Sequence, residues 1–471
     1  MPASKSPRPP RSNKAPETPE KAARSRQGGR PDSKSGGKPA PHGKRQTLVE
    51  WLTELIYELE TFEVPADAML SQFFRTRPFF GGRERHILAE GAYCWLRFRL
   101  RINHLSQGGS GSSVPRQAKL ALLWSGAPED VWAKGKPADN DWLSRVINVS
   151  PNDLPQEPKT CLPAWLFDTL VEEQGAAQAM RFAVYALSAA PLDVRVNTLK
   201  TTPEVLLGQF AEQGVQAQPI EGLPGGLRVE GKPPLGRTEL FANGHFEVQD
   251  AGSQWVSRLA APRRGDLVVD FCAGAGGKTL SIAALMKNTG RIVAVDNSER
   301  RLQKFKPRAA RSGQSNCTTL LINDEHDPRL NRYFGKADRV VVDVPCSGTG
   351  TLRRNPDLKF RQSRDTVAQL NQLQASILEA ASRLVKPDGR LIYMTCSVLR
   401  SENEAIVEAF LANHPEFRLR KWTEVLGPSE RPAGVDLQAE CLRMWPDVTQ
   451  TDGFFAAVLQ RNKTPEVLPD A

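Results

Sequence analysis

Apolar residues at helical spacing begin after Thr47 and predict an all-helical region over residues 47–150. Its first helix carries an apolar face formed by Leu48, Trp51, Leu52, Leu55, Ile56 and Leu59. A second helix is predicted at about 83–100, and shorter helices resume around 116–124. The stretch SQGGSGSSVP (106–115) predicts a flexible interruption between them. No catalytic constellation is evident in this region.

The pattern then changes twice. A helical stretch over 163–190 is followed by an alternating strand at 192–196, a helix at 203–213 and short strands at 214–217 and 226–230, which together predict a small α+β module. After about Gly244 short apolar strands alternate with helices. The strands are expected at 267–270, 291–296, 319–322, 339–343 and 390–395, and the helices after Gly277 and at 298–312, 365–384 and 402–413. This alternation predicts an α/β fold with a parallel sheet covered on both faces.

Charge is concentrated at the N-terminus. The chain carries a net charge of +10. Residues 1–45 hold 12 Lys/Arg and 3 Asp/Glu, so +9 of that charge lies there and +1 lies in 46–471. Because this segment has no Leu, Ile, Val or aromatic residue, it is expected to be disordered. It could bind nucleic-acid phosphates or act as a solubilising tail. Residues 464–471 are expected to form a short C-terminal tail.

Several classes of protein are disfavoured by the composition. There is no long apolar run for a membrane span and no apolar segment of a secretory signal near Met1, so we expect a cytoplasmic, membrane-free monomer. The seven cysteines include no CxxC pair, so neither a zinc ribbon nor a disulfide framework is supported and no metal is expected.

The stretch VVDFCAGAGGKT (268–279) follows a predicted strand and opens a helix, as nucleotide-binding loops do. It misses the phosphate-binding motif because Cys272 stands at the first glycine, and it misses the dinucleotide motif because Thr279 stands at the third. Asp296 closes the second strand, where a carboxylate can accept from both hydroxyls of a ribose. Asp324 follows the third strand and could accept from an adenine amino group. An adenosine cofactor without pyrophosphate, such as S-adenosylmethionine, fits this pattern, although each aspartate could instead cap a strand end.

Two cysteines follow the fourth and fifth strands of the α/β region. Cys346 lies in DRVVVDVPCSGTG (338–350) and Cys396 in GRLIYMTCS (389–397). The ligand side of a parallel sheet is at its strands' carboxyl ends. A thiolate that adds to carbon 6 of cytosine makes carbon 5 nucleophilic, and Asp343 is a candidate acid near ring nitrogen 3. These residues predict covalent methylation of cytosine carbon 5, without deciding which cysteine is the nucleophile.

At these residues the chain resembles the bacterial ribosomal RNA cytosine-5 methyltransferases, relatives of the eukaryotic Nol/Nop/Sun proteins. The resemblance covers about 47–461, and the matching stretches are RVNTLKTT (195–202), FEVQDAGSQ (246–254), DFCAGAGGKT (270–279), VDNSERRL (295–302), VVVDVPCSGTGTLRRNPDLKFR (340–361), YMTCSVLRSENEAIV (393–407) and TDGFFAAVLQR (451–461). Ala275 stands where the family's loop usually has proline.

The resemblance implies a Rossmann-like class I S-adenosylmethionine-dependent methyltransferase domain at 244–463. The resemblance also implies two regions before this domain. A NusB-like helical RNA-binding domain would occupy 46–160, and linker helices with an RRM-like α+β module would occupy 161–243. Cys396 would be the nucleophile and Cys346 would assist product release. The cofactor would contact Cys272, Ala273, Gly274, Ala275, Gly276, Gly277, Lys278, Asp296, Asp324 and Asp343, with Arg301 near the site. The expected substrate is 16S ribosomal RNA.

Two alternatives stay open: a transfer RNA cytosine-5 methyltransferase, and a catalytically idle RNA-binding or ribosome-assembly factor on the same fold. The first would have an identical site. Loss of a cysteine or of a strand-end acid would have favoured the second, and none is lost.

Overall fold

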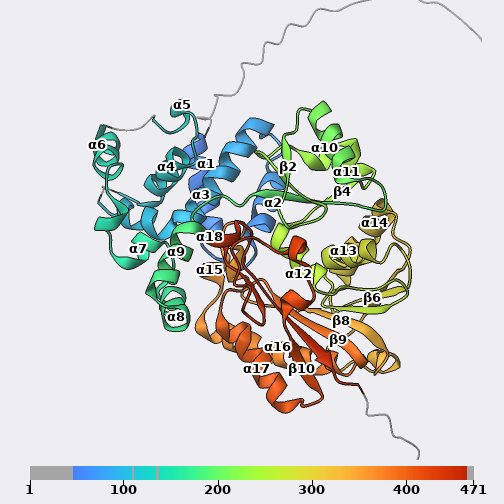
Figure 1. The fold of residues 1–471 in the computed structure, drawn as a ribbon. Coiled ribbons are helices and arrows are strands. Elements are labelled where there is room, and N and C mark those ends of the chain that lie inside the picture. Colours follow the sequence, from blue (N-terminus) through green and yellow to red (C-terminus); the bar gives the residue numbers. More distant parts are fainter. Residues whose placement is uncertain (1–45, 109–110, 134–136, 464–471) are drawn as a thin grey trace, which may run out of the picture. The chain divides into compact units, whose positions relative to one another are not determined.

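The computed structural model describes residues 46–108, 111–133 and 137–463, so the expected tails at 1–45 and 464–471 lie outside the described residues. The N-terminal part is helical, as its pattern predicts (Figure 1). Its helices are α1 (Leu48–Leu59), α2 (Ala66–Thr76), α3 (Gly82–Ser106), α4 (Val114–Trp124), α5 (Glu129–Trp132), α6 (Pro137–Val146) and α7 (Gln156–Thr160). Helix α1 begins in a capping box, in which the Thr47 and Glu50 side chains each accept from the other residue's backbone N–H.

The helical stretch expected at 163–190 consists of two helices, α8 (Ala164–Gln174) and α9 (Ala176–Ala186). Gly175 separates them with a φ of 82°, a conformation that favours glycine and ends α8. One face of this pair packs against Leu352, Val398 and Leu399. These residues lie a few positions after Cys346 and Cys396, so α8 and α9 support the segments that follow the two cysteines.

The small α+β module contains β1 (Leu192–Val196), α10 (Pro203–Glu212), β2 (Ala217–Pro219), β3 (Gly226–Val229), α11 (Glu239–Ala242) and β4 (Phe246–Val248). Its four strands lie in the order β2-β3-β1-β4 and every pairing is antiparallel. The fourth strand lies beyond residue 243, where the sequence places the end of the module. Apolar residues from β1, β3, β4 and α10 form its core, among them Val194, Phe210 and Phe246.

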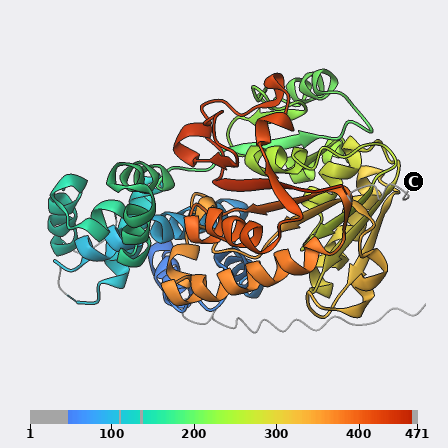
Figure 2. The same cartoon turned by 60° about the horizontal axis from the view of Figure 1, so that its bottom comes forward.

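The remaining residues form an eight-stranded sheet with helices on both faces (Figures 1 and 2). Its elements are α12 (Ala251–Arg258), β5 (Leu267–Phe271), α13 (Gly277–Leu285), β6 (Arg291–Asp296), α14 (Glu299–Ser312), β7 (Cys317–Leu321), β8 (Ala337–Asp343), α15 (Leu358–Arg361), α16 (Arg364–Ser382), β9 (Val385–Thr395), α17 (Glu404–Asn413), β10 (Phe417–Arg420), β11 (Leu442–Met444), α18 (Pro446–Thr449) and β12 (Phe454–Arg461).

Strand order in this sheet is β10-β12-β9-β8-β5-β6-β7, and β11 pairs with β12. Strands β5 to β9 are mutually parallel, as expected. The edge of the sheet formed by β10, β11 and β12 differs from the expected parallel arrangement. Strand β12 is antiparallel to β9, and β10 and β11 are antiparallel to β12. The sheet is therefore mixed.

Successive residues of each central strand face opposite helices. On one face Val269, Val340 and Leu391 pack with residues of α16 and α17. On the other face Val268, Val341 and Ile392 pack with residues of α12 and α13. This double burial explains why the strands are almost continuously apolar. It also fixes the strands' carboxyl ends, from which the segments bearing the expected site residues extend. No described helix is long and apolar enough to cross a membrane.

Candidate active site

The loop between β5 and α13 has an unusual backbone. Cys272, Gly274 and Gly276 all have positive φ values, of 65°, 58° and 81°. The Ala273 N–H donates to the Val295 carbonyl at 2.9 Å, which ties the loop to β6. A Cβ atom on Gly276 would lie 2.0 Å from the Phe305 ring, so glycine is required there by both conformation and space.

Asp296 lies at the end of β6, next to this loop. Its two carboxylate oxygens accept from the backbone N–H groups of Gly274 at 2.8 Å and Ser298 at 2.7 Å, and Arg301 lies 3.8 Å away. Asp324 is exposed and accepts from the His326 N–H at 2.9 Å. Both carboxylates do cap local backbone. They also line one pocket, whose other walls are Phe271, Cys272, Asn297, Arg301, Ile322, Glu325, Pro345, Leu373 and Ile377.

The two cysteines that follow β8 and β9 meet. The Sγ atoms of Cys346 and Cys396 lie 3.3 Å apart, and both residues are half-buried. The hydrogen bond to Cys396 and burial raise the pKa of the Cys346 thiol well above its ordinary range. The Cys346 thiol therefore holds its proton more tightly than an isolated thiol does.

Lys278 and Asp343 form an ion pair beside the cysteines, with Nζ and Oδ2 2.7 Å apart. Burial acts to lower the pKa of Lys278, but Asp343 and the nearby Cys396 outweigh it and raise that pKa. Its ammonium group thus stays charged beside the Asp343 carboxylate. The sequence places both residues at the site but gives no sign of their pairing, because Lys278 lies in the first turn of α13 and Asp343 ends β8.

Gly350 joins the segments that follow the two cysteines. Its N–H donates to the Cys396 carbonyl at 2.9 Å, and its carbonyl accepts from the Gly453 N–H at 2.8 Å. A Cβ atom at Gly350 would lie 2.2 Å from the Gly453 carbonyl oxygen and 2.8 Å from that of Cys396. Only glycine allows three segments to approach this closely.

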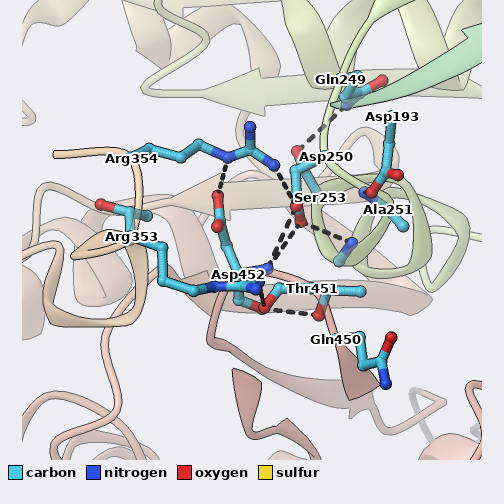
Figure 3. Close-up of polar contacts among 12 residues, drawn as sticks. Asp193, Gln249, Asp250, Ala251, Ser253, Arg353, Arg354, Gln450, Thr451 and Asp452 are labelled. Carbon is cyan, nitrogen blue, oxygen red and sulfur yellow. Dashed lines mark hydrogen bonds and ion pairs between the residues drawn. The ribbon is translucent and has the colours of Figure 1, made fainter. Parts of the chain in front are cut away.

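An ion-pair network supports the same segment further along the chain (Figure 3). The Arg354 guanidinium lies between two carboxylates, donating to Asp452 Oδ2 at 2.6 Å and to Asp250 Oδ2 at 2.8 Å. Arg353 donates to the Thr451 carbonyl. Burial and the nearby Asp250 raise the pKa of Asp452 to about 7. Sequence reasoning missed this network, although all four charged residues lie in the stretches that carry the family resemblance.

A buried carboxylate, Glu402, was also missed. It accepts from residues directly after both cysteines. Its sequence context, RSENE, is typical of an exposed helix start, so no local signal marks it as buried.

Strands β5 to β9 run parallel, and the antiparallel strand β12 pairs with β9 beside them. A glycine-rich loop faces Asp296 at the end of β6. Together these features define a Rossmann-like S-adenosylmethionine-dependent methyltransferase. A family model described as the 16S rRNA methyltransferase RsmB/F matches residues 257–460, and one described as the ferredoxin-like domain of RsmF/B-like methyltransferases matches 162–235. The chain therefore belongs to the RsmB/F methyltransferase family.

Relatives agree with this assignment. A probable ribosomal RNA small subunit methyltransferase B from Synechocystis is 37% identical over 64% of this chain and 66% of its own length. A probable enzyme of the same name from Bacillus subtilis is 32% identical over 64% of this chain and 67% of its own length. The match thus leaves about a third of each relative uncovered. The crystal structure of PH0851 superposes with a TM-score of 0.71 at 27% identity, covering 88% of this chain and 98% of that one. The Pyrococcus horikoshii structure called NSun6 with SFG shares the fold, with a TM-score of 0.57 at 21% identity over 64% of this chain and 99% of its own.

Proposed function

We propose that the protein transfers a methyl group from S-adenosylmethionine to carbon 5 of a cytosine in 16S ribosomal RNA. The observation that carries the proposal is the pair of sulfur atoms 3.3 Å apart, beside the Lys278–Asp343 ion pair. Methylation of an amine nitrogen needs no thiol, whereas cytosine carbon 5 needs one, because it becomes nucleophilic only after a thiolate has added to carbon 6. The proposal places the protein in the cytoplasm with the ribosomal RNA.

The residues around the loop fit this cofactor. Apolar walls from Phe271, Ile322, Leu373 and Ile377 suit an adenine ring, and Asp296 and Asp324 supply carboxylate acceptors in the same pocket. Each carboxylate oxygen that accepts one backbone N–H keeps a second lone pair for a hydroxyl or amino group. Residues 272–278, with Arg301 and Asp343, would complete the contacts. The bound cofactor would supply an electrophilic methyl group.

The two cysteines take different parts in the reaction. The Cys396 thiolate would form a bond to carbon 6 of cytosine while ring nitrogen 3 takes up a proton, and the Asp343 carboxylate would accept a hydrogen bond from the resulting N–H. Once its sulfur is bonded to carbon, Cys396 carries no charge, so one cause of the raised pKa of Cys346 disappears. Cys346 would then assist removal of the carbon 5 proton. The electron pair left behind reforms the double bond between carbons 5 and 6 and expels the Cys396 sulfur.

Residues before the methyltransferase domain are proposed to bind RNA. The helical region at 46–160 would act as a NusB-like domain, and the module at about 161–243 as an RRM-like one. The strand order β2-β3-β1-β4 of the module supports the second assignment, because RRM sheets are four-stranded platforms on which bases stack. The names of the curated relatives support 16S ribosomal RNA rather than transfer RNA.

Substitution of each cysteine tests the mechanism. Cys396→Ala should abolish transfer of labelled methyl groups to RNA but leave cofactor binding intact. Cys346→Ala should trap a protein–RNA adduct that survives denaturant and migrates slowly in a gel. Cys441→Ala, at a half-buried cysteine outside the site, is the matched control. Normal turnover by Cys396→Ala, or no adduct with Cys346→Ala, would refute these assignments.

Bisulfite sequencing identifies the substrate. A cytosine in 16S ribosomal RNA should be protected when the wild-type protein is present and unprotected when Cys396→Ala replaces it. Protection confined to transfer RNA would select the alternative enzyme. If neither RNA shows protein-dependent protection, the chain is an idle assembly factor.

A further inference from the structure

Glu402 lies at the end of the short turn 400–402 between β9 and α17, and it is fully buried. Its carboxylate accepts four hydrogen bonds: from the Ser347 N–H and hydroxyl, the Ser397 hydroxyl and the Gln374 side chain. Among the described residues no basic side chain forms an ion pair with it. A carboxylate held entirely by neutral donors is costly to bury, so the arrangement calls for an explanation.

The donors come from the residues that follow each cysteine. Ser347 follows Cys346 and donates to Glu402 Oε1 through its N–H at 2.8 Å and to Oε2 through its hydroxyl at 2.5 Å. Ser397 follows Cys396 and donates to the same Oε2 atom. One carboxylate therefore connects the two cysteine-bearing segments directly.

Gln374 of α16 extends this connection. Its side-chain amide donates to Glu402 Oε1 at 3.0 Å and to the Pro345 carbonyl at 2.9 Å. Because Pro345 precedes Cys346, that cysteine is held on both sides by groups that also bind Glu402.

The backbone around Glu402 is itself fixed. The Glu173 carboxylate of α8 accepts from the N–H groups of Arg400 at 2.7 Å and Ser401 at 3.2 Å. On the other side, the Asn403 side chain donates to the Ser397 carbonyl at 3.0 Å and accepts from the Thr395 hydroxyl at 2.6 Å. The position of the Glu402 carboxylate is therefore set by its own backbone and not by the segments that follow the two cysteines.

We propose that Glu402 is a positioning residue that sets the separation of the Cys346 and Cys396 sulfur atoms by binding Ser347 and Ser397 with one carboxylate. The inference rests on the proposed function, in which both sulfurs act on one pyrimidine ring. A displacement of 1 Å in such a site can reduce the rate about 100-fold.

Two substitutions of Glu402 distinguish the effect of its side-chain length from the effect of its charge. Glu402→Asp keeps the charge but is one methylene shorter, so its carboxylate cannot bind both serines. Glu402→Gln keeps the length, and its oxygen can still accept from the Ser347 N–H and Gln374 while its amide donates to the two hydroxyls. Glu408→Gln, an exposed glutamate on α17, is the matched control.

The direct readout is bridging of the two thiols by phenylarsine oxide. Its arsenic atom binds two sulfurs and its oxygen leaves as water with the two thiol protons, so bridging requires close sulfurs but no methylation. The bridged peptides are identified by mass spectrometry after digestion. Methylation of RNA gives the second readout, as kcat and KM measured separately.

Glu402→Asp should bridge at least about tenfold more slowly and lose about 100-fold in kcat with little change in KM for RNA. Glu402→Gln should keep both within about tenfold of the wild type, and Glu408→Gln should match the wild type. Wild-type bridging and kcat in Glu402→Asp would overturn the proposal. Equal losses in Asp and Gln would also overturn it, since charge and not reach would then matter.

Ser397→Ala is the second variant, and it serves if Glu402→Asp does not fold. It removes the hydrogen bond from Ser397 to Glu402, together with those that the Ser397 hydroxyl forms with the Thr349 hydroxyl and the Leu399 N–H. It should slow bridging as Glu402→Asp does; unchanged bridging contradicts the proposal. If the wild-type protein methylates no RNA, the proposed function fails, but the bridging rates still decide the role of Glu402.

Discussion

At the scale of single residues, burial of the Asp270 carboxyl group on β5 makes the stability of the protein depend on pH. Asp270 is fully buried, its Oδ2 atom accepts from the Thr279 hydroxyl at 2.5 Å, and its Oδ1 atom has no partner among the described residues. Burial, with a contribution from Asp343, raises its pKa from 3.8 to about 7. The folded protein therefore holds this proton more tightly than the unfolded chain does. Stability is lost as the pH rises from about 4 through about 7.

Asp270→Asn should remove this pH dependence, because an amide cannot ionise but can still accept from Thr279. The free energy of unfolding of the wild type should fall relative to that of the variant by up to about 4 kcal/mol between pH 4 and 8, since each pKa unit is worth about 1.4 kcal/mol. Denaturant titrations at several pH values measure this difference. The exposed Asp168→Asn should follow the wild type, and parallel curves for wild type and Asp270→Asn would contradict the assignment.

Sequence reasoning predicted which residues would gather but not how they would pair. Cys346 and Cys396 were placed together because both follow parallel strands, and their sulfurs are in contact. Lys278 was expected at the cofactor loop, yet its partner is Asp343, 65 residues away. Glu402 was not foreseen, because a buried carboxylate is recognised only by the donors that surround it.

At the scale of elements, the turn from β5 into α13 depends on Gly276. Gly276→Ala should destabilise the protein by roughly 2–5 kcal/mol, the sum of a left-handed backbone cost and displacement of the Phe305 ring. Binding of S-adenosylmethionine should weaken with it. Chemical unfolding and calorimetric titration measure the two effects.

Gly208→Ala is the matched control for this prediction. Gly208 is exposed in α10 and an added Cβ would meet nothing within 4 Å, so alanine should stabilise the helix by about 0.5–1 kcal/mol. Equal stability of the two alanine variants would show that the loop does not require glycine at position 276.

Elements with strong periodicity were predicted closely. The strands at 192–196 and 291–296 have the expected bounds, and α1 spans the residues whose apolar face was expected, Leu48 to Leu59. The stretch at 163–190 is helical as expected, although the sequence pattern did not show that Gly175 ends one helix and begins the next. Strand β12 was not predicted, and its direction could not be read, since a buried strand is apolar throughout whether it runs parallel or antiparallel.

At the scale of the whole molecule, most of the net positive charge lies in the N-terminal segment and not in residues 46–471. Because +9 of the net +10 lies in residues 1–45, their deletion should reduce RNA affinity at low salt and flatten the dependence of affinity on salt concentration. The methylated base should not change. Binding measured between 50 and 200 mM salt for the full chain and for residues 46–471 tests this. An unchanged slope would make the segment a solubilising tail.

The sequence patterns predicted a helical part, a small module and an α/β part, but they did not predict the contacts between the corresponding elements. The Lys359 ammonium donates to the Arg97 carbonyl at 2.8 Å, and Asp357 accepts from the Ala66 N–H at 3.3 Å. Burial lowers the pKa of Lys359 to about 8. Such contacts join residues 262 and 291 positions apart, a distance over which periodicity carries no information.

The place of β12 has a consequence for synthesis. This strand lies between β9 and β10, although both are made before it. While the nascent chain leaves the ribosome, the edge of β9 beside Cys396 has no partner until residues 454–461 have emerged. In a chain that ends before residue 454, the segment that bears Cys396 would lie beside an unpaired edge of β9. Such an edge is prone to pair with strands of other chains. The sheet beside Cys396 is thus completed by nearly the last residues that the structure describes.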